Sequence, residues 1–346
     1  MKMKKKKRGG KVLVVLSVIA GVMIAAAVFV FLSPWPAVWL LRHGGDGPID
    51  VPRGYEEKTS GVVVQKGLTY TSEYGKNQFD LYLPKDGENM PLILWVHGGA
   101  FVAGDKSGLK IWGSLLASEG YAVAAMNYEW APEASWPAQV IQVSDCLKEL
   151  QKLSDDSVSL DMSRIFLAGD SAGAHMAAQA AIACFNEDYA QKTGISMPIK
   201  KENLKGVLLY CGPYELEAFA KIDNGLLNFF MNKIGQSYVG TLNWQKNEKT
   251  QYLNIIPWLT KDCPPVYITD GNSGSFESQG KNLGGALRQL NVSVQERYFP
   301  KSEGQIPHEY QMQLTSPQGQ ACYKDTLEFL KMYSERKGGN NESGED

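Results

Sequence analysis

Residues 164–183 read RIFLAGDSAGAHMAAQAAIA, and this segment decides the fold. Its first five residues have the apolar composition of a buried strand, and its last ten have the composition of a helix. Between them Ser171 lies in a G-x-S-x-G pattern, flanked by Gly169 and Gly173. A sharp turn from strand to helix exposes the serine, and small flanking residues let the backbone bend. The pattern therefore predicts a nucleophilic Ser171, although a purely structural glycine-rich turn has the same letters.

The rest of the chain alternates strand and helix signals around this segment. We expect strands over 61–70, 78–84, 92–96, 121–128, 164–168, 206–212, 264–271 and 294–299. The first two are expected to be antiparallel, and residues 137–153 have helical spacing. Such alternation predicts an α/β fold with a mostly parallel central sheet and helices on both faces, in which catalytic groups gather at the carboxyl ends of the strands.

A second motif, HGGAF at residues 97–101, follows the strand expected over 92–96. Glycines after a strand allow backbone N–H groups to point at a ligand. The N–H groups of Gly98, Gly99 and Ala100 are therefore candidate oxyanion donors, opposite the N–H of Ala172. His97 is expected to brace this loop.

A serine nucleophile needs a base, and the chain has only four histidines. His43 precedes the folded part, His97 belongs to the oxyanion motif, and His175 follows the nucleophile on its own helix. His308 comes after the last expected strand, where the base of this fold belongs in the order serine, acid, histidine. Elimination therefore predicts that His308 is the base.

Three segments in this order resemble the hormone-sensitive-lipase-like branch of the α/β-hydrolases, which includes bacterial carboxylesterases. They are HGGAF, NYEWAPEASWPA at residues 127–138, and GDSAGAH at residues 169–175, and the resemblance extends over about residues 60–335. Glu129 and Trp130 depart from the family's middle motif. The resemblance implies an α/β-hydrolase fold with a cap and hydrolysis of short- to medium-chain esters through an acyl-enzyme. It also implies that no metal or organic cofactor takes part.

The acidic residue of the catalytic triad, the group that pairs with the histidine, is the point at which this sequence departs most from the family's pattern. The family's pattern places it at Gly274, which has no side chain. Asp270 at the end of the preceding strand is narrowly favoured over Glu277, and Glu215 is a third option. A carboxylate is needed because it holds the histidine tautomer and stabilises the imidazolium. Two other acidic residues match positions typical of the family and are interpreted as structural: Asp145 and Asp170.

The N-terminus carries a targeting signal. Seven basic residues lie within residues 1–11, and residues 12–32 are apolar and uncharged. A helix of that length spans the roughly 30 Å hydrocarbon core of a bilayer. We expect an uncleaved signal anchor with a cytoplasmic N-terminus and an extracytoplasmic catalytic domain, and a cleaved signal peptide is the alternative.

The expected organisation is a basic cytoplasmic segment (1–11), a transmembrane anchor (12–32), a linker (33–60), the hydrolase domain (61–335) and a disordered tail (336–346). An aromatic-rich interruption at about 215–262 is interpreted as a helical cap. The whole chain has a formal charge of −2, so the part after residue 11 carries −9, which argues against a nucleic-acid partner. The five cysteines have neither zinc-site nor disulfide-framework spacing.

The sequence therefore predicts a membrane-anchored serine carboxylesterase that acts on a small ester without a metal or cofactor. An amidase, a peptidase or a deacetylase of cell-envelope polymers would use the same catalytic groups. A non-catalytic surface binding protein is a further alternative, supported only by the glycine at position 274. The sequence leaves the oligomeric state open.

Overall fold

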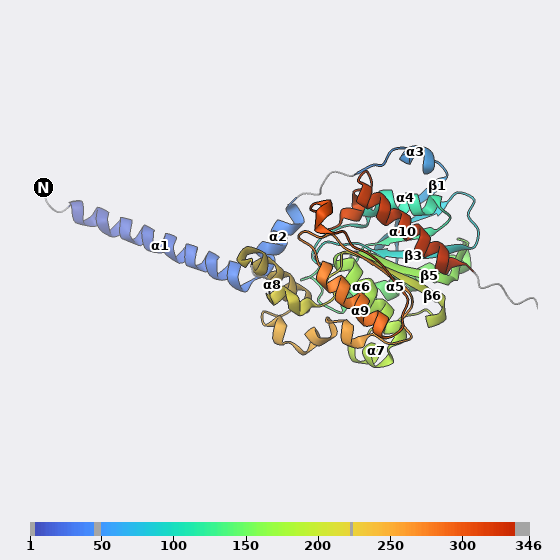
Figure 1. Ribbon diagram of the computed structural model, residues 1–346. Helices are drawn as coiled ribbons and strands as arrows, with labels where there is room; N and C mark the ends of the chain where they lie inside the picture. The colour runs from blue at the N-terminus through green and yellow to red at the C-terminus, as the bar shows by residue number, and fades with distance from the viewer. Residues whose placement is uncertain (1–3, 45–49, 222–223, 336–346) are drawn as a thin grey trace, which may run out of the picture.

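A computed structural model describes residues 4–44, 50–221 and 224–335, so the expected disordered tail lies outside the described residues. Eight strands form one sheet in the order β1-β2-β4-β3-β5-β6-β7-β8 (Figure 1). Their bounds are β1 Val62–Thr69, β2 Gln78–Pro84, β3 Met90–Val96, β4 Ala122–Met126, β5 Leu160–Asp170, β6 Leu204–Tyr210, β7 Val266–Thr269 and β8 Val294–Arg297.

The sheet directions match the sequence-based expectation. β1 and β2 pair antiparallel, and β2 pairs antiparallel with β4, whereas the strands from β4 to β8 pair in parallel. The carboxyl ends of β3, β5, β6, β7 and β8 therefore lie along one edge of the sheet. The loops that follow these strands carry the candidate site.

Helices cover both faces of the sheet, each with its own buried core. On one face α5 (Ala138–Asp156), α6 (Ala172–Phe185) and α9 (Glu277–Gln289) bury Val143, Ala177 and Leu283. On the other face α4 (Lys110–Ser118) and α10 (Pro317–Ser334) bury Trp112 and Phe329. A parallel sheet that is buried on both sides explains why its strands read as nearly continuous apolar runs.

The interruption expected at 215–262 forms a cap of one α-helix and several short 3-10 turns. The α-helix is α8 (Gly225–Val239), and the turns include Leu216–Lys221, Trp244–Lys246, Glu248–Tyr252 and Ile256–Trp258. Trp244 is buried against Gly235 of α8, where a side chain would collide with the indole ring. The cap therefore has an aromatic core of its own.

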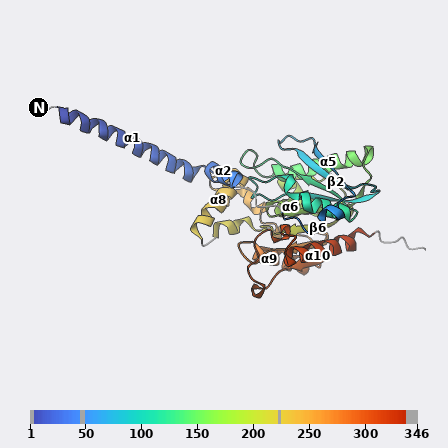
Figure 2. The same ribbon diagram turned by 90° about the horizontal axis from the view of Figure 1, so that it is seen from above.

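The N-terminal part differs from the expected linker. Helix α1 (Lys4–Leu32) projects alone from the domain, and its apolar stretch Gly10–Leu32 has no buried residue (Figures 1 and 2). Within the expected linker, α2 (Trp35–His43) is a helix that packs against α8, and Tyr55–Lys58 form the short helix α3. Val38 of α2 is buried, so this segment belongs to the folded body. Helix α7 (Glu187–Thr193) completes the described α-helices.

Candidate active site

Ser171 lies on the sharp turn between β5 and α6. Its backbone has φ 50° and ψ −119°, a conformation that side chains rarely adopt. The glycines on each side permit the bend, because a Cβ at Gly169 would collide with the backbone of Gly173 and a Cβ at Gly173 would collide with the carbonyl oxygen of Val96. Tight approach of strand and helix thus explains the G-x-S-x-G pattern in steric terms.

His308 reaches Ser171 from the loop after β8. Its Nε2 lies 2.9 Å from the Ser171 Oγ, within hydrogen-bond distance. The loop that carries it is tied to the loop after β7, since the Oδ1 of Asn272 accepts the N–H of Ile306 at 2.9 Å. Gly271 makes this close approach possible, because a Cβ there would collide with the carbonyl oxygens of Ile306 and Pro307. The two loops therefore position His308 together.

The other ring nitrogen of His308 faces a hydroxyl. Ser275 Oγ lies 2.7 Å from Nδ1, and the same hydroxyl contacts Oδ1 of Asp270. Asp270 is buried and also accepts the backbone N–H groups of Gly271 at 2.7 Å and Phe276 at 3.0 Å. One proton assignment fits every contact: Nδ1–H donates to Ser275, whose O–H donates to Asp270. Nε2 is then free to accept from Ser171.

Glu277, the other leading candidate for the acid, does not take part in this chain of contacts. It begins α9, where its carboxylate pairs with Lys281 at 2.6 Å. Glu215 instead accepts a hydrogen bond from Asn282 at 3.0 Å. The expectation of Glu277 therefore does not hold, because the Nδ1 position that it would occupy is taken by Ser275.

Ser275 was not among the residues predicted from the sequence, because a triad acid must carry a negative charge and a serine hydroxyl carries none. The signal was present, since Ser275 directly follows Gly274, the position that lacks its acid. Gly274 has φ +62° and closes the turn that brings residue 275 back over Asp270. A short polar side chain beside a vacated catalytic position was the available clue.

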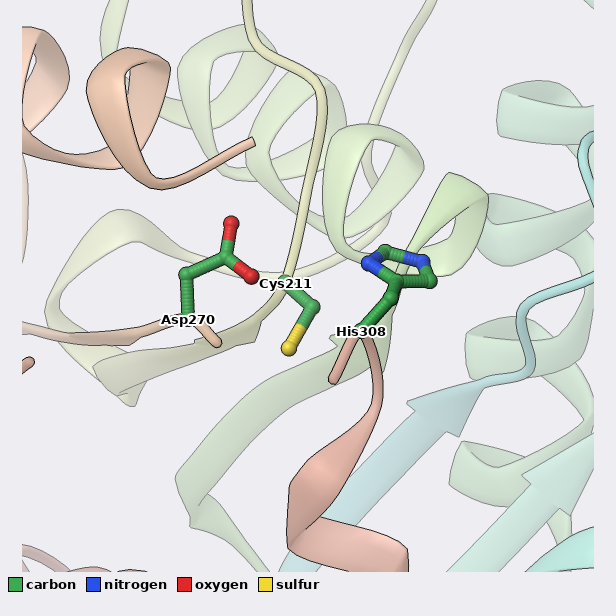
Figure 3. A group of neighbouring side chains, drawn as sticks. All are labelled: Cys211, Asp270 and His308. Carbon is green, nitrogen blue, oxygen red and sulfur yellow. The ribbon is translucent and has the colours of Figure 1, made fainter. Parts of the chain in front are cut away.

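Cys211, after β6, also borders this part of the site. Cys211, Asp270 and His308 each have one atom that could bind a metal ion, and these three atoms lie within 4.8 Å of one another. Figure 3 shows the carboxylate and the imidazole pointing toward each other with Cys211 between them. Burial raises the pKa of the Cys211 thiol well above its ordinary value, and its Sγ contacts Oε1 of Gln311 at 3.3 Å. A neutral thiol is a poor metal ligand, and Asp270 already accepts three hydrogen bonds, so the cluster fits a hydrogen-bonded acid and base better than a metal site.

The oxyanion loop after β3 corrects one expectation. The N–H of Gly98 donates to Oδ2 of Asp170 at 2.8 Å, so it is not available to a substrate oxygen. The N–H groups of Gly99 and Ala100 donate no hydrogen bond to any described residue. Ala172 is the first residue of α6, where the N–H has no acceptor within the helix. Three of the four expected donors therefore remain open.

The remaining histidines have structural partners. His97 stacks on Tyr128 with ring centroids 4.4 Å apart, and its Nδ1 contacts the carbonyl of Gly98. His175 is buried, with Nε2 3.0 Å from the carbonyl oxygen of Leu253. His43 contacts the carbonyl oxygen of Trp39. Of the four histidines, His308 is the one placed against the nucleophile.

Most of the chain that carries this geometry matches a known protein family. The BD-FAE family matches residues 79–278, which include the oxyanion loop, the turn at Ser171 and Asp270. The chain belongs to the BD-FAE family. The match ends before His308, so the candidate base of this BD-FAE chain is identified only by the contacts described above.

The chain is also similar to individual proteins that are named esterases. The BD-FAE chain is 27% identical to an acetyl esterase of Salmonella choleraesuis (strain SC-B67) over 283 residues, which cover 78% of this chain and 81% of that protein. It resembles the crystal structure of esterase B from Lactobacillus rhamnosis with a TM-score of 0.69 and 21% identity, covering 92% and 95% of the two chains. A bacterial heroin esterase has a TM-score of 0.65 and 21% identity, with coverage of 80% and 86%. The expected α/β-hydrolase fold is thus confirmed.

Burial changes the pKa values of the candidate acid and the candidate base of this BD-FAE chain in opposite directions. Desolvation lowers the pKa of His308 to about 4, so the imidazole is neutral at pH 7 and can accept a proton. Desolvation raises the pKa of Asp270 to about 6, against the hydrogen bonds from Ser275 and from backbone N–H groups. Both groups are thus in their working protonation states at neutral pH.

Two buried carboxyl groups, those of Asp170 and Glu309, lie next to the turn that carries Ser171. Asp170 accepts Trp95 Nε1 at 2.6 Å and the N–H of Gly98, so it ties the oxyanion loop to β3 and β5. Glu309, next to His308, hydrogen-bonds to Asp170, and burial together with the Asp170 charge raises the pKa of Glu309 to about 8. Two close carboxyls share one proton in such a pair, so Glu309 is the proton donor at neutral pH.

Helix α2 holds the outside of the oxyanion loop. Arg42 Nε donates to the carbonyl oxygen of Val102 at 2.7 Å, and its guanidinium forms a two-pronged ion pair with Glu133. The same guanidinium reaches the carbonyl oxygen of Ala131 at 3.2 Å. Since Ala100 and Phe101 both have positive φ, this loop has an unfavourable backbone that surrounding contacts must hold. Arg42 supplies several of those contacts.

Proposed function

We propose that this BD-FAE chain is a serine carboxylesterase that cleaves short- to medium-chain carboxylic esters through an acyl-enzyme. The observation that carries the proposal is the 2.9 Å contact between Ser171 Oγ and His308 Nε2 on a strand–turn–helix bend. A hydroxyl becomes nucleophilic when a base accepts its proton and fixed dipoles receive the charge that develops.

The reaction begins as His308 takes the Ser171 proton while the oxygen attacks the ester carbonyl carbon. The N–H groups of Gly99, Ala100 and Ala172 stabilise the oxyanion of the tetrahedral intermediate. His308 then gives its proton to the leaving alkoxide, which departs as an alcohol and leaves an acyl-serine. Water repeats the cycle, with His308 as its base, and releases the carboxylic acid.

Asp270 is the acid in this scheme, and it acts through Ser275. The imidazolium that forms in each step donates to Ser275, and the carboxylate lowers the energy of that charge through the hydroxyl. A complete relay of this kind argues against the reading of the chain as a non-catalytic binding protein. The reading rested only on the glycine at 274.

The wall of the site favours modest apolar acyl groups. Phe276 meets the His308 ring edge-to-face with centroids 5.4 Å apart, and Phe219 of the cap stacks on Phe276 at 5.8 Å. Aromatic side chains beside the reacting atoms suit an apolar acyl chain better than a charged one. The structural relatives include an esterase B inhibited by a tributyrin phosphonate, which supports short acyl chains as the first probes.

We further propose that α1 is a signal anchor that spans a membrane, with the basic N-terminus in the cytoplasm and the catalytic domain outside. An exposed 23-residue stretch, Gly10–Leu32, whose residues 12–32 carry no charge, supports a span, and the basic residues up to Lys11 support the direction. Alkaline carbonate extraction of membranes tests the anchor. Protease accessibility of the domain on intact cells tests the direction.

The enzymatic proposal is tested with a fluorophosphonate probe and aryl esters of increasing acyl length, on the parent and on Ser171→Ala. We expect probe labelling and ester turnover in the parent, and a loss of turnover by about 10⁴-fold or more in the variant. An aryl anilide and an acetylated glycan, assayed beside the esters, distinguish an amidase, peptidase or envelope deacetylase. A folded parent that neither labels nor turns over any of these substrates contradicts the proposal.

A further inference from the structure

The start of the cap helix α8 exposes an apolar surface. Leu226 and Leu227 have relative exposures of 70% and 48%. The sequence over 225–232 is GLLNFFMN, which has no charged residue. Exposed leucines on an uncharged turn suit a partner that is itself apolar.

Helix α8 is fixed to the end of α1. Gln236 Nε2 donates to the carbonyl oxygen of Leu32 at 2.7 Å, and Lys233 Nζ donates to the carbonyl oxygen of Phe31 at 2.5 Å. These carbonyls belong to the last turn of α1, where no intrahelical donor reaches them. Phe229 meets the ring of Phe31 edge-to-face at 6.0 Å. Side chains of α8 thus cap α1 and set its position relative to the domain.

The order of these contacts gives the direction of the exposed turn. Going back along α8 from Gln236 to Phe229, the contacts move from the carbonyl of Leu32 to the ring of Phe31. Leu226 lies three residues before Phe229 and therefore on the same side of the helix, one turn further on. Figures 1 and 2 both show α8 beside the C-terminal end of α1. The exposed start of α8 thus lies at the level of the last apolar residues of α1.

The length of α1 relates that level to a bilayer. Its 23-residue apolar stretch is about 35 Å long, a little more than the roughly 30 Å hydrocarbon core, so its end reaches the interface. Trp35 and Trp39 follow within α2 and are exposed, as suits the interfacial aromatic belt. An uncharged helical turn at this height can enter the interface without burying a charge.

We propose that the first turns of α8, residues 225–231, form a membrane-contact surface that lies in the interfacial layer of the bilayer spanned by α1. This inference rests on the proposed anchor, and it goes beyond it because it assigns a second contact with the lipid to the cap. The same helix reaches the catalytic loop at its other end, where Tyr238 stacks on Phe101 at 3.8 Å. The membrane contact therefore holds the cap and the oxyanion loop at a set height above the lipid.

The test uses the full chain in phosphatidylcholine vesicles that carry a nitroxide on the upper acyl chain. An environment-sensitive fluorophore is attached at Leu226→Cys or, as a matched control, at Met332→Cys, an exposed apolar site on α10 with 62% exposure. The unsubstituted chain, treated in the same way, measures labelling of its native cysteines. Turnover of a soluble aryl ester by each variant reports folding and tests the esterase proposal separately.

We expect quenching by the lipid nitroxide to be at least about twofold stronger at position 226 than at 332, and quenching by an aqueous ion to show the reverse order. Equal quenching at the two positions, with the chain retained in the vesicles, overturns the membrane-contact surface. Release of the chain from the vesicles by carbonate also overturns it, because the anchor then fails. Ester turnover in either case leaves the enzymatic proposal standing.

Discussion

Ser275 places its hydroxyl 2.7 Å from Nδ1 of His308, the position that a carboxylate takes in a serine hydrolase triad. The carboxylate belongs to Asp270, which contacts the Ser275 hydroxyl and not the imidazole ring. The site therefore has four members in a row, and its acid acts on the base through a neutral group. A hydroxyl can pass on hydrogen-bond polarisation but carries no charge of its own.

The first prediction concerns this relay. Asp270→Asn is expected to lower kcat by about 10²–10³-fold, less than a directly bonded acid because a hydroxyl intervenes, and Ser275→Ala by about 10–10²-fold. Glu277→Gln is the matched control and is expected to change kcat less than about twofold, since its partner is Lys281. Steady-state kinetics on an aryl acetate measure all three. A loss in Glu277→Gln as large as that in Asp270→Asn would show that the acid is misassigned.

The second prediction is the acid limb of the kcat/KM profile. His308 has its pKa lowered to about 4 by burial, so it keeps its basic form well below the ordinary histidine value. Asp270 has its pKa raised to about 6 and becomes neutral below it. We expect kcat/KM to decline from about pH 6 and to be lost near pH 4, and Asp270→Asn to retain only the lower step. A single half-point near 7 in both proteins contradicts this assignment.

The third prediction follows from the raised pKa of Glu309. The folded chain keeps this proton up to about pH 8, whereas an unfolded chain releases it near the ordinary value of 4.5. The contribution of Glu309 to the free energy of unfolding is therefore fully present below the unfolded-state pKa of 4.5 and is lost as pH rises through the folded-state pKa of about 8. Between pH 6 and 8 this group by itself is expected to lower the free energy of unfolding by about 1–3 kcal/mol. Three buried histidines with lowered pKa values, His97, His175 and His308, raise it over the lower part of the same range, so the quantity to measure is the difference between the parent and Glu309→Gln.

Glu309→Gln tests this origin, since its amide donates to Asp170 at every pH. Between pH 6 and 8 the free energy of unfolding of the variant is expected to change less unfavourably than that of the parent by about 1–3 kcal/mol, in urea unfolding of the detergent-solubilised chain followed by tryptophan fluorescence. His97 and Tyr128 also face the pair. Burial lowers the pKa of the imidazole, which therefore gains a proton only on unfolding and does so in parent and variant alike, and burial raises the pKa of the phenol above this window. The same dependence of the free energy of unfolding on pH in the parent and in Glu309→Gln would show that Glu309 does not contribute to it.

The fourth prediction concerns Arg42. Its removal in Arg42→Ala takes away hydrogen bonds to the carbonyl oxygens of Val102 and Ala131 and is expected to lower kcat about tenfold through the oxyanion loop. Because the ion pair with Glu133 is partly exposed, its own share of the loss of stability is expected to stay below about 1 kcal/mol, and the two carbonyl oxygens left without their donor account for any larger loss. Glu133→Gln is the control, since it removes the charge and leaves the carbonyl contacts. Equal kinetics in Arg42→Ala and the parent would show that α2 does not position the loop.

Local sequence patterns were sufficient to predict the strands of the sheet. The strand around residues 164–168, the turn at Ser171 and the helix after it are each encoded by neighbouring residues, through apolar runs and glycines at close approaches. His308 could be found because histidines are few and the order of groups in this fold is known. The fate of the Gly98 N–H could not be found in this way, because its acceptor Asp170 lies 72 residues away.

The sequence by itself determined the α/β architecture, the candidate nucleophile and the candidate base. Only the tertiary structure decided that Asp270 meets His308 through Ser275, and that the expected linker is a helix which holds the oxyanion loop. The physical reason is the same in both cases. A hydrogen bond forms only if its donor and acceptor are placed to within about an ångström. Here the donors and acceptors lie on loops that are distant in the sequence, so no local pattern of residues predicts their separation.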